Sequence, residues 1–172
     1  TSLVNGFAIQ LANGRVPGLF HSGVRPAVNT GLSVSRVGRS AQRNAMKAVS
    51  GSLRIELSQY REMAVFARFG SDIDSATKSM LDKGECLVNI FKQGKGSPYS
   101  LFDEVALLLA YKSGKLVGTK QNQYAAVTEA LLSFLHEKCS AVMNEMNLSG
   151  DMTEKQREEI EKSIAEWSYE NE

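Results

Sequence analysis

From residue 40 onward, apolar residues recur every three or four positions, and this spacing constrains the fold more than any other feature of the sequence. The first such run extends from Ser40 to about Phe66 and is interrupted at Gly51. Spacing of this kind places apolar side chains on one face of an α-helix. We therefore predict a mainly α-helical chain, with its helices packed as a bundle.

Local stop and capping signals divide the remainder into further helices. Gly84 is expected to end one of them, because glycine is common just beyond the last residue of a helix. Ser100 and Thr153 each carry a hydroxyl that can cap the first turn of a helix. The predicted helices cover residues 74–83, 85–91, 100–112, 122–147 and 153–169.

Residues 1–38 have a different pattern. Glycine, proline and short apolar stretches such as "FAIQL" indicate a short strand followed by turn-rich loops. The sequence therefore predicts two parts, a short β-containing segment over residues 1–38 and a helical domain over residues 39–172.

Composition excludes several kinds of protein. Twenty basic and nineteen acidic residues give a net charge of +1, so we expect no nucleic-acid partner. Cys86 and Cys139 lie far apart and are expected to be reduced thiols. His21 and His136 also lie far apart, and no metal site is predicted from them. No apolar run reaches the length of a membrane span.

Three stretches, in this order, resemble one family. They are "PAVNTGLSVS" (26–35), "QYREMAVFARFGSDID" (59–74) and "FKQGKGSPYS" (91–100). The first resembles a signature shared by the alpha and beta subunits of F-type rotary ATP synthases, and the combination of all three resembles the alpha subunit. The resemblance extends from about Leu19 to about Tyr111.

The resemblance implies only the last third of such a subunit. Residues 1–38 would be the end of the central nucleotide-binding domain, and residues 39–172 the C-terminal helical domain. The chain contains no phosphate-binding G-x-x-x-x-G-K-[ST] motif and begins at Thr1 rather than Met. We therefore expect a subunit that is encoded or cleaved in two pieces and that has no catalytic activity alone.

Arg36 falls on the position of the family's arginine finger. The resemblance implies that it reaches across a subunit interface to ATP bound on the beta subunit, and that Ser35 lines the same interface. A guanidinium suits this role, because it offers a rigid fork of donors to phosphate oxygens. Without the resemblance, an arginine between a strand and a helix is more often a surface ion-pair partner.

A second set of residues matches the family's non-catalytic nucleotide site, which holds ATP or ADP with Mg²⁺ on the alpha subunit itself. Arg25 and Pro26 match family residues that lie against the base of this nucleotide. Gln93 matches a glutamine that contacts its adenine side. Lys95 departs from the family, which has a second glutamine there, so an amide is replaced by a pure donor. A flexible polar loop is the alternative interpretation of "KQGKG".

The resemblance also implies partners and a location. The partners are the N-terminal part of the alpha subunit, the beta subunit, the central shaft subunit gamma and the peripheral stalk, with the membrane reached only through the rest of the complex. Asp72 and Asp74 contact the shaft or cap a helix. Proton-driven ATP synthesis at the matrix side of the mitochondrial inner membrane is expected, with a plastid thylakoid or bacterial inner membrane as the alternative.

Two other functions stay open at this point. The chain can be a stand-alone helical interaction module derived from the alpha subunit, or a piece of another hexameric rotary or secretion ATPase. Retention of Arg36 argues against the first, and "QYREMAVFARFGSDID" favours an F-type enzyme over the second.

Overall fold

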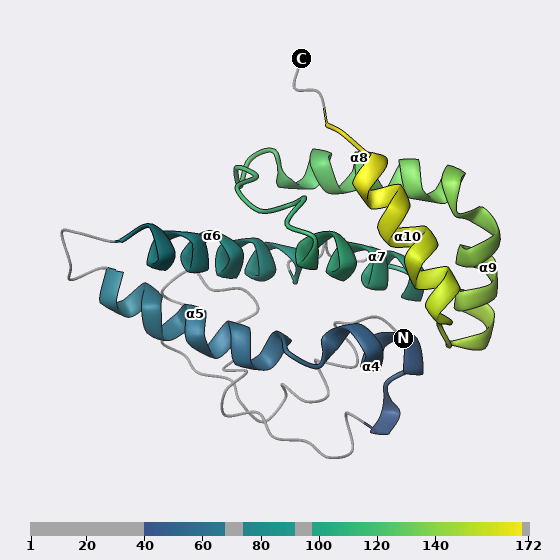
Figure 1. The fold of residues 1–172 in the computed structure, drawn as a ribbon, viewed down its shortest axis with the longest axis horizontal. Coiled ribbons are helices and arrows are strands. Elements are labelled where there is room, and N and C mark those ends of the chain that lie inside the picture. The colour runs from purple at the N-terminus through teal and green to yellow at the C-terminus, as the bar shows by residue number, and fades with distance from the viewer. Residues whose placement is uncertain (1–39, 68–73, 92–97, 170–172) are drawn as a thin grey trace.

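A computed structural model of the chain describes residues 40–67, 74–91 and 98–169 (Figure 1). Within these ranges the regular elements are helices, which confirms the prediction of a mainly α-helical bundle. They are α4 (Asn44–Ser50), α5 (Leu53–Ala67), α6 (Ser75–Ile90), α7 (Leu101–Lys112), α8 (Tyr124–Lys138), α9 (Ser140–Ser149) and α10 (Glu154–Glu166). The strand and loops predicted for residues 1–38 lie outside the described residues.

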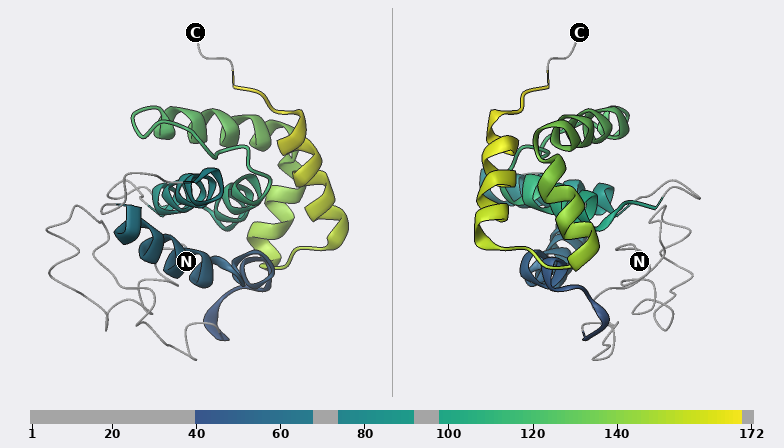
Figure 2. Two further views of the ribbon diagram at one scale, coloured as in Figure 1. Left: turned by 60° about the vertical axis from the view of Figure 1, so that its left-hand side comes forward. Right: turned by 90° about the vertical axis from the view of Figure 1, so that its right-hand side faces the viewer.

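Helix α7 is the centre of the bundle. It packs against α4, α6, α8, α9 and α10. In the views of Figures 1 and 2, α6 and α7 form a middle layer, with α8 on one side and α4 and α5 on the other. Residues 102–111 of α7 are all buried. Asp103 and Glu104 in the first turn are the charged exceptions. Beyond them, an enclosed helix needs apolar side chains around its whole circumference, which explains the continuous run "VALLLAY".

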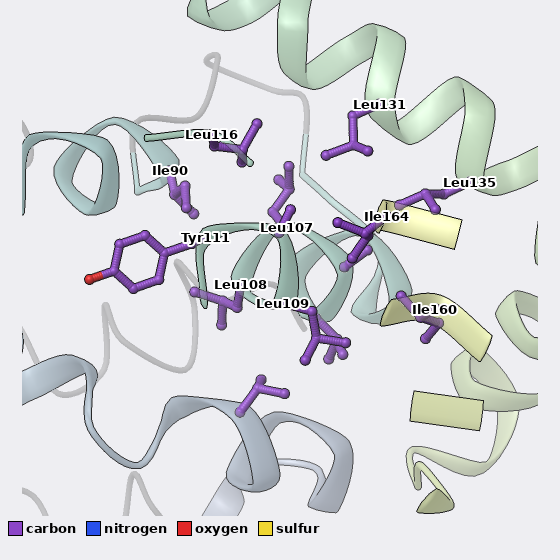
Figure 3. Close-up of a cluster of buried hydrophobic side chains, with 14 of the residues drawn as sticks. Ile90, Leu107, Leu108, Leu109, Tyr111, Leu116, Leu131, Leu135, Ile160 and Ile164 are labelled. Carbon is purple, nitrogen blue, oxygen red and sulfur yellow. The ribbon is translucent and has the colours of Figure 1, made fainter. Parts of the chain in front are cut away.

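The core is formed where side chains of α7 meet those of its neighbours (Figure 3). Leu107, Leu108 and Leu109 each have at most 1% of their surface exposed, and so do Leu131 of α8 and Ile164 of α10. Burying a leucine or isoleucine side chain fully stabilises a fold by about 1.5–3 kcal/mol. Burial of these side chains therefore holds the bundle together, whereas Ile55 and Phe66 of the first predicted apolar run are 62% and 69% exposed.

Helices α5 and α6 pack against each other as an antiparallel pair (Figure 1). The predicted helix end at Gly84, within this pair, is wrong. Gly84 does not end a helix: residues 75–90 form the single helix α6, and Gly84 is buried in its interior. A Cβ at this position would overlap the ring of Tyr60 on α5. The glycine permits close contact between two helices, so its role is in packing rather than in termination.

The prediction of a single helix over residues 122–147 is also wrong, because two helices, α8 and α9, lie there. The chain bends at Cys139, whose backbone angles (φ −115°, ψ 30°) separate α8 from α9. The Cys139 thiol is buried and donates a hydrogen bond to Ser163 Oγ on α10 at 3.4 Å. The bend lets α9 pack against both α7 and α8.

The capping predictions are confirmed. Ser100 Oγ accepts from the backbone N–H of Asp103, and Thr153 Oγ1 accepts from that of Gln156, each within a capping box. Helix α10 ends at Glu166 rather than at residue 169, because Trp167 is extended and buried. Lys115 Nζ donates to the carbonyl oxygens of Ala165 and Trp167 at 3.1 and 2.8 Å and closes this end.

Candidate functional site

The predicted site residues lie outside the part of the chain that the structure describes. They are Arg25, Pro26, Ser35, Arg36, Gln93 and Lys95. The structure therefore neither brings them together nor separates them. What it does show is how the flanking residues are held, at the start of α4 and on both sides of residues 92–97.

A network of contacts joins the start of α4 to the turn between α9 and α10. Residues Arg43–Ala45 and Ser149–Asp151 form this network, which we call the helix-end clamp. Asn44 Nδ2 donates to Asp151 Oδ1 at 2.6 Å, and Arg43 Nη1 donates to the carbonyl oxygen of Ser149 at 3.3 Å. No local sequence pattern indicates these contacts, because the partners are more than 100 positions apart.

The start of α6 is fixed by Asp74. Its side chain accepts a hydrogen bond from the backbone N–H of Thr77 at 2.9 Å. Hydrogen bonding to the side chain of Thr77, and then to this N–H, lowers the pKa of the Asp74 carboxyl. Of the two roles left open for Asp74, helix capping is the one for which the structure gives a contact. Asp72 lies outside the described residues.

The start of α7 is held more tightly. Asp103 accepts a hydrogen bond from the backbone N–H of Ser100 through Oδ2, and its Oδ1 lies 2.6 Å from His136 Nε2 on α8. The backbone N–H of Phe102 donates to Asn147 Oδ1 on α9 at 2.9 Å. Helices α7, α8 and α9 therefore meet at the start of α7.

A cavity of about 420 Å³ lies between α5, α6 and the end of α7. The Tyr111 hydroxyl donates a hydrogen bond of 2.5 Å to Glu56 Oε2 on its wall. Burial raises the pKa of Tyr111 well above its usual range, and the hydrogen bond to the Glu56 carboxylate raises it further. The other described lining residues are Gln59, Ala76, Ser79, Met80, Lys83, Gly84 and Lys112.

Both cysteines are free and buried, which agrees with the prediction of reduced thiols. Burial raises the pKa of the Cys86 thiol to about 11 and also raises that of Cys139. The thiolate is the nucleophilic form, so neither residue has the character of a reactive cysteine.

The described ranges show neither a metal-binding cluster nor a membrane-spanning helix. No group of three or more His, Cys, Asp or Glu side chains there is arranged to hold a metal ion. No helix of this part of the chain combines the length and apolar character that a membrane span requires.

Comparison with known proteins identifies the family. Residues 42–167 match the family "ATP synthase alpha/beta chain, C terminal domain". An "ATP synthase subunit alpha" from Ruthia magnifica is 40% identical over 146 residues, which are 85% of this chain and 28% of that protein. One from Petrotoga mobilis is 38% identical over 162 residues, covering 92% of this chain and 32% of that protein.

The chain therefore belongs to the ATP synthase alpha/beta family, and its described helices are the C-terminal domain of that family. Both relatives are alpha subunits, as the three sequence motifs indicate. The chain spans about a third of the length of these relatives. It corresponds to the C-terminal part of an alpha subunit.

Proposed function

We propose that this chain completes the alpha subunit of an ATP synthase and supplies an arginine to a catalytic site on the neighbouring beta subunit. The observation that carries the proposal is the extent of the similarity to alpha subunits. The Petrotoga relative aligns with 92% of the chain, so the similarity extends into the segment before residue 42. That segment contains the motif "PAVNTGLSVSR", which ends at Arg36.

Arg36 would act on a nucleotide held by another chain. A guanidinium is charged at every physiological pH and presents parallel donors that match phosphate oxygens. It would stabilise the negative charge that develops as the terminal phosphoryl group is transferred. Ser35 would line the same interface, and the chain alone would have no ATPase activity.

The second site would retain ATP or ADP with Mg²⁺ without hydrolysing it. Arg25, Pro26 and Gln93 would contact the nucleotide, whereas Lys95 would replace a neutral amide by a cation. Lys95 can donate to a phosphate or a carboxylate but cannot accept a hydrogen bond from adenine.

The partners would be the remainder of the alpha subunit, the beta subunit, the gamma shaft and the peripheral stalk. The complex would be attached to a proton-conducting membrane through other subunits. The residues of the three motifs favour a location at the matrix side of the mitochondrial inner membrane. A bacterial inner membrane or a plastid thylakoid is the alternative location.

Native mass spectrometry of the complex purified through this chain tests the assignment. We expect beta subunits, the remainder of the alpha subunit and gamma to be recovered with it in fixed ratios. Recovery of the chain without beta subunits would overturn the proposal and would favour a stand-alone interaction module.

A further inference from the structure

We infer that the turn between α9 and α10 positions the segment that carries Arg36, and that it does so through the helix-end clamp. The inference rests on the proposed function, because it assigns a task to residues that act through Arg36. Arg43 and Asn44 would be positioning residues, since neither is expected to touch the nucleotide. In Figures 1 and 2, the start of α4 lies beside the turn that joins α9 to α10.

The two helix ends satisfy each other's backbone groups. The N-cap residue of α4 is Arg43, whose side chain makes no capping hydrogen bond. The N–H of Ala45 instead donates to the carbonyl oxygen of Gly150 at 3.1 Å. In the other direction, the Arg43 guanidinium donates to the carbonyl oxygen of Ser149, the last residue of α9. One free N–H at the start of α4 is thus paired with the carbonyl of the C-cap residue of α9, and the carbonyl of Ser149 is paired with the Arg43 side chain.

The backbone conformation of Gly150 favours glycine at this place. Its φ of +81° lies in the left-handed region that L side chains rarely adopt. A Cβ there would also lie 2.6 Å from Cδ and 2.7 Å from Nη1 of Arg43. The Arg43 side chain therefore lies directly against the backbone of the turn.

Asn44 and Asp151 add a contact between side chains. The distance of 2.6 Å from Nδ2 to Oδ1 is short for an amide–carboxylate pair, and the acceptor is charged. The side chains of Ala45, Met46 and Val49 on α4 are buried in the core. Helix α4 is therefore fixed both by the core beneath it and by the turn at its first residues.

The clamp is close in sequence to the proposed arginine finger. Arg36 and Arg43 are separated by seven positions of one polypeptide. The clamp fixes the point in the helical domain from which the chain leads to Arg36. A group that stabilises a transition state must be placed within about half an ångström, and a displacement of about 1 Å can reduce the rate about a hundredfold. Loosening the clamp should therefore lower turnover while nucleotide binding is preserved.

The test exchanges the amide and the carboxylate in the assembled complex. Asn44→Asp alone places two carboxylates in contact, and we expect kcat per assembled ring to fall about tenfold while the KM for ATP changes less than twofold. Adding Asp151→Asn restores an amide–carboxylate pair with reversed direction, and kcat should return to within about twofold of the parent. Asn144→Asp adds the same charge at an exposed position of α9 and should have no effect. Asn44→Ala, with an expected loss of about threefold, replaces Asn44→Asp if the latter reduces assembly.

The same substitution in an Arg36→Ala background shows whether the clamp acts through Arg36. We expect no further loss there, because two residues that act as a unit have non-additive effects. An equal fall of kcat in both backgrounds, or a failure of the exchange to restore kcat, would overturn the inference. Near-normal turnover of Arg36→Ala would instead overturn the proposed function, so the two failures are distinguishable.

Discussion

The ring of Tyr60 on α5 occupies the space in which a side chain on Gly84 of α6 would begin. Replacing glycine by alanine inside a helix normally stabilises it by about 1 kcal/mol. At Gly84 the new methyl group would overlap the ring, and overpacking of this kind costs about 1–3 kcal/mol. We predict that Gly84→Ala lowers the free energy of unfolding by about 1–2 kcal/mol, as measured by urea denaturation.

Gly51 provides the matched control. It has a right-handed helical backbone (φ −58°) and no atom within 4 Å of the position of a Cβ. Gly51→Ala should be neutral or should stabilise the chain by up to about 1 kcal/mol. Equal effects of the two substitutions would show that α5 and α6 do not approach each other as described.

The hydrogen bond from Tyr111 to Glu56 should contribute measurably to stability. Tyr111→Phe removes the donor and leaves a half-buried carboxylate without it, which should cost about 1–2 kcal/mol. Tyr169→Phe is the control, because Tyr169 is 38% exposed and its hydroxyl makes no hydrogen bond within the described residues. The stability of both variants is measured by thermal denaturation. A loss of stability in Tyr169→Phe as large as that in Tyr111→Phe would contradict a stabilising role of the hydrogen bond from Tyr111 to Glu56.

The buried Cys86 thiol predicts a loss of stability at alkaline pH. Its pKa is raised to about 11 in the folded chain, from an ordinary value of 9.0. Above pH 9 the unfolded chain releases this proton and the folded chain retains it, so the unfolded state is favoured as pH rises. The contribution of this thiol to the free energy of unfolding is fully present below pH 9 and is lost between pH 9 and pH 11. Between pH 8 and pH 10 the loss should be about 1 kcal/mol from this group.

Cys86→Ala isolates this contribution. The fall in the free energy of unfolding between pH 8 and pH 10 should be about 1 kcal/mol smaller in the variant than in the parent chain. Identical falls in the two proteins would show that the thiol ionises as readily in the folded chain as in the unfolded one.

Gln93 should matter for nucleotide retention and not for turnover. The family motif assigns it to a site that binds without hydrolysing, and one neutral hydrogen bond is worth about 1 kcal/mol. Gln93→Ala should release the non-catalytic nucleotide from purified complexes several times faster and leave the ATPase rate within a few-fold. A loss of turnover as deep as that of a catalytic variant would place this residue in the active site instead.

Helix boundaries could be predicted where the signal is local. The capping boxes at Ser100 and Thr153 lie within four residues of the helices they begin, and both predictions are confirmed. The interruption at Gly51 is likewise found between α4 and α5. Each of these depends on the chemistry of one short segment.

Boundaries that depend on distant contacts could not be predicted. Gly84 has the sequence signature of a helix stop, but Tyr60, 24 positions earlier, makes it an interior contact residue. The bend at Cys139 has neither glycine nor proline, and its partner Ser163 lies on another helix. The helix-end clamp is equally invisible, because Asn44 and Asp151 are 107 positions apart.

The site itself could be predicted only through the family resemblance. No periodicity or capping rule distinguishes Arg36 from Arg39, which follows three positions later in the same basic stretch. The motif before Arg36 makes the distinction, because it assigns one of the two arginines to a subunit interface. The roles of Arg36 and Gln93 therefore stay predictions.

The ATPase rate of assembled complexes that carry Arg36→Ala tests the central claim most directly. We expect turnover to fall about a thousandfold, equivalent to about 4 kcal/mol of transition-state stabilisation, with assembly and nucleotide content unchanged. Arg36→Lys should restore little, since an ammonium lacks the planar fork of donors. Arg39→Ala, the control, should leave the rate near that of the parent. Near-normal turnover in Arg36→Ala would contradict the account and would mean that the neighbouring catalytic site does not use this arginine.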